Sequence, residues 1–209
     1  MLHNGYIFRI TVLLKYLTYG GSIMKRLILT LILICFLTGC GGTNVQITDG
    51  LMLRQRLLEG GGCSFIAEIT ADYGKEIYQF SAECCGDEQG NLQFTVLEPE
   101  SISGITGSVT ETGGKITFDN EVLAFSPIAD GQITPVTAPW IFLKTLRSGY
   151  IASCTDGEEL THLQINDSYN EKALHLDIWL DHSNLPVHAE ILWEGRRILS
   201  LKIKDFTIL

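Results

Sequence analysis

The chain has 209 residues, of which 24 are acidic and 15 are basic, and its net charge is −9 at neutral pH. Four of the basic residues precede Cys40 and every acidic residue follows it, so the chain from Cys40 onward carries a net charge of −13. A surface this acidic repels phosphate groups. We therefore expect no nucleic-acid partner and no membrane attachment through a basic patch.

The residues that precede position 40 have the parts of an export signal. Lys25 and Arg26 are followed by an uncharged run, residues 27–39, which is short for a membrane span of about 20 residues. Leu37-Thr38-Gly39-Cys40 resembles the lipobox of bacterial lipoproteins, in which the cysteine accepts diacylglycerol and becomes the mature N-terminus. The alternative is a cleavable signal or plain anchor with an incidental cysteine. We expect export, covalent diacylglycerol on Cys40 without any other cofactor, and anchoring to the bacterial cell membrane or outer membrane.

A second apolar segment, residues 6–19, precedes this signal and contains Arg9 and Lys15. A signal peptide does not ordinarily carry such a segment ahead of its cationic start, so we expect translation to begin at Met24. An extended signal or a first membrane segment is the alternative, which the two internal charges disfavour. The expected organisation is an upstream extension (1–23), a signal peptide (24–39), a lipidated tether (40–49) and one domain (50–209).

The 170 residues from Cys40 onward are enough for one domain with a hydrophobic core. A helix is expected at 51–58, and apolar residues then alternate with polar ones at the period of two that is typical of strands. Strands are expected around 65–73, 78–84, 92–96, 102–110, 115–118 and 122–125. The Gly- and Ser-rich fourth strand would leave room on the sheet, and Asp119-Asn120 would join the last two as a hairpin. Hairpin-linked strands predict an antiparallel sheet that curls to cover its apolar face.

A different pattern follows at 134–149, where Pro139 suits a first helical turn and Gly149 suits a helix end. Apolar residues nearly surround this helix, which indicates burial on more than one side. Core packing explains the pattern, and so does a helix seated over the mouth of a curved sheet. Further strands are expected around 163–165, 174–180, 185–193 and 199–203. The predicted fold class is mainly β (α+β): a curved antiparallel sheet forming an incomplete barrel, packed on one or two helices.

Cys63, Cys84, Cys85 and Cys154 follow the lipidation site. Cys63 begins one expected strand and Cys84-Cys85 end the next, so one disulfide between neighbouring strands and unpaired structural thiols both agree with the sequence. Adjacent cysteines in a strand point to opposite faces, and the spacing matches no zinc pattern. We expect no metal site.

Residue types that serve catalysis occur outside catalytic patterns. The sequence contains no Gly-x-Ser-x-Gly, His-Glu-x-x-His or phosphate-loop motif. His175 and His188 alternate with the apolar residues of their strands, and His182 lies in a turn, so we expect these side chains and His162 at the solvated surface. We expect no enzymatic activity.

The order of signal, helix, strands, Pro-led apolar helix and final meander resembles the LolA/LolB-like lipoprotein carrier superfamily. The closest local similarity is residues 180–190, Leu-Asp-His-Ser-Asn-Leu-Pro-Val-His-Ala-Glu, in which a strand ends at Asp and Leu-Pro opens the next strand. Residues 202–206 are similar to the closing strand and 120–123 to the central hairpin, although Asn120 stands where the family usually has Gly. The resemblance covers most of residues 50–209 and implies an apolar cavity that holds acyl chains.

The residues expected to line such a cavity lie on the apolar phases of three successive strands and on the later helix. They are Phe65, Ile69, Tyr78, Phe80, Phe94, Trp140, Phe142 and Leu143. We expect a monomeric, membrane-anchored envelope lipoprotein that binds or carries lipids, lipoprotein acyl chains or other amphipathic ligands there. A protein-interaction or sensor module of the envelope on the same scaffold is the alternative, and an unrecognised hydrolase is the third class.

Overall fold

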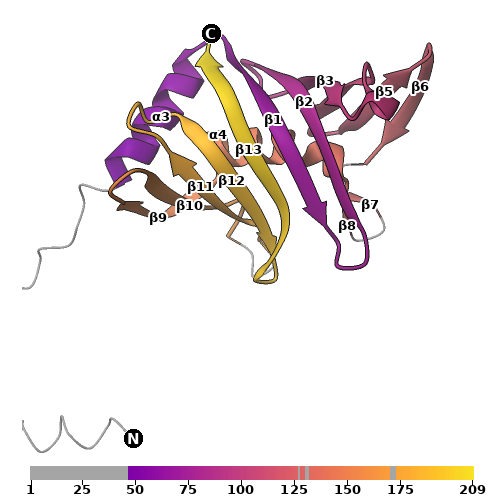
Figure 1. Ribbon diagram of the computed structural model, residues 1–209. Helices are drawn as coiled ribbons and strands as arrows, with labels where there is room; N and C mark the ends of the chain where they lie inside the picture. The colour runs from indigo at the N-terminus through magenta and orange to yellow at the C-terminus, as the bar shows by residue number, and fades with distance from the viewer. Residues whose placement is uncertain (1–46, 127, 130–131, 170–172) are drawn as a thin grey trace, which may run out of the picture. The chain divides into compact units, whose positions relative to one another are not determined.

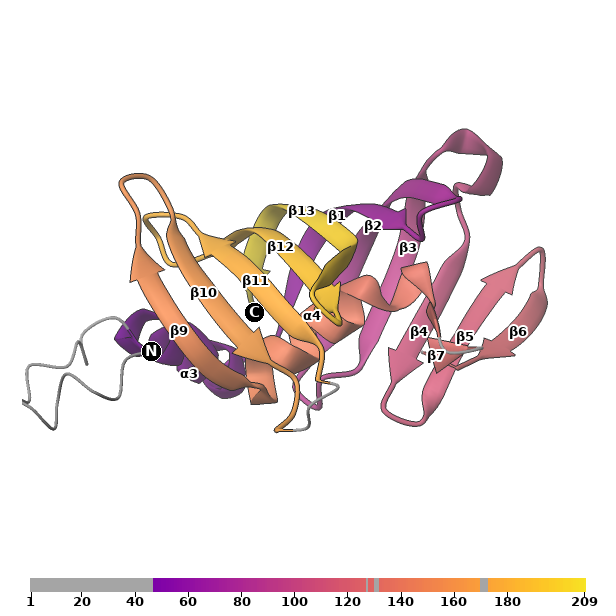
Figure 2. The ribbon, with the colours of Figure 1, turned by 90° about the horizontal axis from the view of Figure 1, so that it is seen from below.

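The computed structural model describes residues 47–126, 128–129, 132–169 and 173–209 (Figure 1). The expected extension, export signal and lipobox lie outside these residues. In the described part, one antiparallel sheet of 11 strands has the order β6-β5-β4-β3-β2-β1-β13-β12-β11-β10-β9. The sheet curls around a helix and stays open between β6 and β9 (Figure 2), so the predicted incomplete barrel is confirmed.

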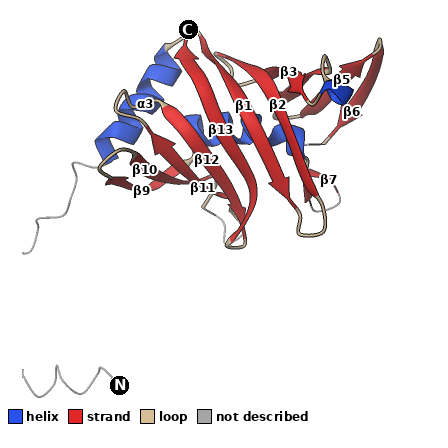
Figure 3. Ribbon diagram, in the orientation of Figure 1, coloured by secondary structure: helices blue, strands red, loops and turns tan. Residues whose placement is uncertain are grey.

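The elements follow one another as a meander interrupted by one helix (Figure 3). The first half comprises α3 (Ile47–Glu59), β1 (Gly62–Asp72), β2 (Ile77–Asp87), β3 (Leu92–Glu98), η1 (Glu100–Ile102), β4 (Thr106–Thr110), β5 (Gly113–Phe118) and β6 (Glu121–Phe125). The connection comprises β7 (Ile128–Ala129), β8 (Gln132–Ile133), η2 (Pro135–Thr137) and α4 (Ala138–Ser148). The second half comprises β9 (Tyr150–Asp156), β10 (Thr161–Asn166), β11 (His175–Leu180), β12 (Pro186–Trp193) and β13 (Arg196–Ile208).

The first and last strands of the meander pair at the middle of the sheet. β1 and β13 are antiparallel neighbours from Cys63, opposite Ile208, to Ala71, opposite Leu199. This pairing joins the two halves of the meander into one sheet. The alternation expected in β1 is confirmed, because Phe65, Ala67, Ile69 and Ala71 are all buried.

The Pro-led helix lies inside the curl of the sheet. α4 contacts β2, β10, β12 and β13 on the inner face, and it also contacts α3. Eight of its 11 residues are buried, as the nearly continuous apolar surface predicts. Gly149 ends the helix and its N–H donates to the Thr145 carbonyl at 2.7 Å. The core-packing interpretation is therefore confirmed, because α4 is buried against the inner face of the sheet.

Several elements differ from the expectation, and the sequence pattern does not predict β7, β8 or η2. α3 begins at Ile47 rather than at residue 51, within the segment assigned to the tether. The expected fourth strand divides into η1 and β4, because Gly104, at φ 83°, turns the chain between them. β9 was not predicted, because a register shift opposite Ile165 breaks the period of two, leaving Ile151 and Cys154 as its buried residues.

The hairpin turn between β5 and β6 uses the left-handed region without glycine. Asp119 has φ 49° and Asn120 has φ 66°. Asn and Asp adopt this region more readily than other residues with a Cβ, because their short polar side chains bond locally. The Asn120 that departs from the superfamily pattern therefore still makes the expected hairpin.

Candidate functional site

One row of cross-strand partners crosses the first half of the sheet on its inner face. Partners directly opposite in an antiparallel sheet point to the same side. The row runs through Phe65, Cys84, Phe94, Gly107, Ile116 and Leu123. It starts in the core beneath α4 and ends on the edge strand β6.

The eight predicted lining residues all lie on this inner face or on α4. Six of them are at most 6% exposed: Phe65, Ile69, Phe94, Trp140, Phe142 and Leu143. Phe80 is half-buried and Tyr78 is 46% exposed. The Phe65 ring lies edge-on to Phe142, with centroids 5.8 Å apart, and stacks on Phe206 at 5.5 Å. The buried six thus pack within the core, and their contact with a ligand stays a prediction.

The small residues of β4 and β5 support aromatic rings instead of leaving empty room on the sheet. A Cβ built on Gly107 would lie 2.4 Å from Cζ of Phe94, and one on Gly114 would lie 2.2 Å from Cζ of Phe125. Each ring therefore lies over a glycine of the neighbouring strand. The absence of a side chain at these two positions is a packing requirement.

Beyond these rings, the inner face of the β5–β6 hairpin remains apolar and becomes exposed. Ile116 and Phe125 are half-buried, whereas Phe118 is 50% exposed and Leu123 is 67% exposed. The helix α4 covers β2 and the β10–β13 side of the sheet. We call Ile116, Phe118, Leu123 and Phe125 the hairpin face. Period-two patterning does not predict this face, because it does not tell which strands a helix covers.

A cleft of about 330 Å³ adjoins the hairpin face on the outward side of α4. Trp140, Ile141 and Leu174 are its apolar walls, and Ser126, the residue after Phe125, is at its rim. Lys144 Nζ lies 5.0 Å from the centre of the Trp140 ring and 4.0 Å from Glu111 Oε1. The cleft thus combines an apolar wall with one cation, Lys144, and two carboxylates, Glu111 and Asp167.

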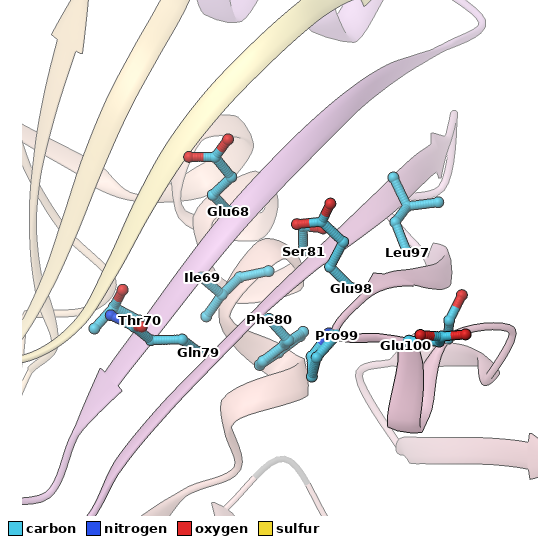
Figure 4. A pocket seen from close by; sticks show the side chains of 11 residues that line it. Glu68, Ile69, Thr70, Gln79, Phe80, Ser81, Leu97, Glu98, Pro99 and Glu100 are labelled. Carbon is cyan, nitrogen blue, oxygen red and sulfur yellow. The ribbon is translucent and has the colours of Figure 1, made fainter.

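A larger and more polar cleft, about 720 Å³, opens where β2 and β3 separate (Figure 4). β3 pairs with β2 only from Ser81 to Gly86, so residues 77–80 of β2 have a partner on one side only. Glu68, Glu98 and Glu100 line the cleft together with Phe80 and Pro99. The hydrogen bond from Lys204, aided by Lys202, lowers the pKa of Glu68. Three carboxylates line this cleft, so it favours polar molecules over acyl chains.

Two of the histidines have a more specific arrangement than the expected solvated surface. His162 and His188 contact the two sides of Trp179 on the outer face of the sheet, each with ring centres 4.9 Å away. His162 Nε2 lies 3.0 Å from Asp177 Oδ1. His175 and His182 are exposed as expected. Across the described ranges, no three His, Cys, Asp or Glu side chains are placed to hold a metal ion.

The four cysteines of the domain are free thiols. Cys63, Cys84 and Cys154 are buried, and Cys85 is exposed. Burial raises the pKa of the Cys63 thiol to about 11, and it also raises the pKa of Cys84 and Cys154. Since thiolate is the reactive form, the buried three are inert packing groups at neutral pH.

A scan against protein-family models finds no match for this chain, and a search of curated proteins finds no relative. Solved structures with a similar fold include an uncharacterized conserved protein from Thermus thermophilus, with 13% identity, a TM-score of 0.44, and coverage of 78% of this chain and 88% of that chain. A LolA superfamily protein from Nitrosomonas europaea has 12% identity and a TM-score of 0.41. The match covers 79% of this chain and 94% of that chain. The lipoprotein LppX from Mycobacterium tuberculosis has 12% identity and a TM-score of 0.38. The match covers 77% of this chain and 92% of that chain. The superfamily that the sequence resembles is therefore represented among these structures.

None of the helices in the described residues is long and apolar enough to cross a membrane.

Proposed function

We propose that this chain is an exported, membrane-anchored envelope lipoprotein that binds lipids or other amphipathic ligands on the inner face of its sheet. The observation that carries the proposal is the hairpin face. Its Ile116 and Leu123 end the row that begins at Phe65. On the same concave side of the sheet, Phe118 and Leu123 are 50% and 67% exposed. Concave surfaces with mostly apolar walls and a few polar groups are typical of small-molecule sites.

The adjoining cleft provides a place for the polar end of such a ligand. An acyl chain on the hairpin face would bury apolar surface on both molecules, at about 25 cal/mol per Å². Lys144 and Glu111 at the opening of the cleft then offer charges of both signs to a headgroup. The six buried aromatic and aliphatic residues of β1, β3 and α4 serve as the rigid support of this site.

A titration of the unlipidated domain with a fluorescent fatty acid or phospholipid tests the proposal. We expect saturable binding that Leu123→Glu abolishes, because an unpaired carboxylate beside an acyl chain is costly. Val122→Glu is the matched control, since Val122 is the preceding residue on β6, is 62% exposed and pairs with Thr117 on the outer face. No saturable binding, or equal loss in both variants, contradicts a lipid site at the hairpin face.

A protein-interaction or sensor module is the second candidate, and the position of β6 favours it. β6 is an edge of the sheet, and its Val122 and Leu123 expose apolar side chains on both faces. An exposed apolar edge strand is a template for pairing with a strand of another chain. In that case both substitutions on β6 would weaken capture of an envelope partner, whereas the lipid probe would not bind.

A further inference from the structure

A second exposed apolar surface lies at the opposite edge of the sheet, where α3 packs beside β9. Leu51, Met52 and Leu58 of α3 are 50%, 43% and 54% exposed. Tyr150, the first residue of β9, is 49% exposed, and Tyr169 in the turn after β10 is 88% exposed. Leu51, Tyr150 and Tyr169 line one shallow cleft of about 680 Å³, and the two tyrosine rings lie 5.3 Å apart. We call these five residues the α3 patch.

The packing of α3 against the domain does not depend on Leu51, Met52 or Leu58, which are exposed. Leu53 and Leu57, four residues apart, are fully buried and anchor the helix to the domain. Leu51 and Leu58 are seven residues apart, two helical turns, so they share a different side of the helix. A helix with apolar residues on its outward side and tyrosines next to it has the chemistry of the membrane interface, where amphipathic rings are enriched.

The sequence also places this patch close to the proposed lipid-bearing residue. Seven residues lead from Cys40 to Ile47, where α3 begins. An extended chain spans at most about 3.6 Å per residue, so this connection reaches about 25 Å. A lipid on Cys40 would therefore hold α3 within that distance of the headgroups. A bilayer surface is thus the partner whose chemistry and proximity fit the patch.

We infer that the α3 patch docks on the bilayer surface and orients the anchored domain. Its position near the bilayer rests on the proposed lipidation of Cys40, whereas its apolar chemistry is independent of it. The attraction is apolar rather than electrostatic. Arg54 is engaged with the carbonyls of Leu146 and Gly149, and the acidic Asp167 lines the same cleft as the tyrosines. Binding should then need no anionic lipid and should change little with salt.

This orientation has a consequence for the ligand face. β9 and β6 are the two edges of the sheet, and α3 and the β5–β6 hairpin lie at opposite ends of the domain (Figures 1 and 2). Docking through α3 therefore leaves the hairpin face turned away from the bilayer that holds the anchor. A ligand or partner would reach the hairpin face from the aqueous side.

The first test uses the unlipidated domain, residues 44–209, which is a compact unit of its own. We expect it to co-sediment with phosphatidylcholine vesicles at low and at high salt. The double variant Leu51→Ser/Tyr169→Ser should lower the bound fraction several-fold, because each exposed side chain inserts apolar surface. Ile77→Ser/Leu97→Ser removes two exposed apolar side chains that belong neither to the α3 patch nor to the hairpin face, and it should leave vesicle binding unchanged. Equal loss in both double variants, or binding that disappears at high salt, overturns the inference.

The second test uses the full lipidated chain in vesicles and remains decisive if the unlipidated domain binds too weakly to sediment. An environment-sensitive fluorophore is attached to Tyr169→Cys in a Cys85→Ala background, which removes the exposed native thiol. We expect a blue-shifted emission at this position and not at Ile77→Cys, since Ile77 is 63% exposed and belongs neither to the α3 patch nor to the hairpin face. A label that stays in water at position 169, or concentration-dependent dimerisation that buries it without vesicles, overturns bilayer docking. Neither readout requires the hairpin face to bind its ligand.

Discussion

Arg54 of α3 and Arg147 of α4 each bind the C-terminal end of the other helix. Arg54 donates through Nε to the Leu146 carbonyl at 2.8 Å and through Nη2 to the Gly149 carbonyl at 2.7 Å. Arg147 donates through Nη1 to the Leu57 carbonyl at 3.0 Å and through Nη2 to the Glu88 carbonyl at 2.6 Å. The last carbonyls of a helix lack partners within it, and a cation there also complements the helix dipole.

We expect Arg147→Met to lower the free energy of unfolding by about 1–3 kcal/mol, because the Leu57 and Glu88 carbonyls lose a charged donor. Urea denaturation measures this change. Arg196→Met is the control, since Arg196 pairs with Asp72 at 3.5 Å in a largely exposed position and should contribute about 0–1 kcal/mol. If the two variants unfold alike, the reciprocal capping does not stabilise the α3–α4 contact.

The ring of Phe94 makes Gly107 intolerant of a side chain. We expect Gly107→Ala to cost about 1–3 kcal/mol of stability, because its Cβ would lie 2.4 Å from Phe94 Cζ and 2.7 Å from the Lys115 carbonyl oxygen. Gly61→Ala, whose nearest neighbour is the Leu209 carbonyl oxygen at 3.8 Å, is the control with ordinary contacts. Thermal unfolding of both variants separates these outcomes, and a neutral Gly107→Ala would contradict the packing of Phe94 against β4.

The exposed thiol of the domain should react much faster than the three buried ones. In the folded domain, iodoacetamide should modify Cys85 and spare Cys63, Cys84 and Cys154 until the domain unfolds, as peptide mass spectrometry would show.

The pKa of Cys63 is raised from 9.0 to about 11, so above pH 9 the unfolded chain releases a proton that the folded domain keeps. Stability is therefore lost as pH rises from about 9 to about 11.

Denaturation at several pH values measures this loss, which for one thiol is on the order of 2 kcal/mol. We expect Cys63→Ala to remove the part of this pH dependence that the Cys63 thiol causes. An alkaline slope that is the same in wild type and Cys63→Ala would contradict the assignment to Cys63.

Lipidation of Cys40 is expected from the lipobox and its flanks. Mass spectrometry of the membrane fraction should find a diacylglyceryl-cysteine peptide that begins at Cys40, and Cys40→Ser should abolish both processing and membrane attachment. Cys85→Ala, which removes a thiol of the domain, should change neither. Processing and attachment that persist in Cys40→Ser would rule out the lipidated anchor.

Local signals were enough to predict most elements of the domain. The period of two in residues 65–71 required one buried face of β1, whichever strands became its neighbours. Pro139 and Gly149 marked the ends of α4 because their backbone constraints act within one turn. Asp119-Asn120 marked the hairpin for the same reason, through left-handed conformations that these residues tolerate.

The candidate sites depended on contacts between residues far apart in the chain. Phe65 and Tyr78 have the same apolar phase in the sequence, yet Phe65 packs beneath α4 whereas Tyr78 is 46% exposed. Leu123 belongs to the row of Phe65, but it is exposed because α4 covers β2 and the β10–β13 side instead. Periodicity determines which face a side chain takes. The curl of the sheet and the pairing of β1 with β13 determine which part of that face the helix reaches and removes from water.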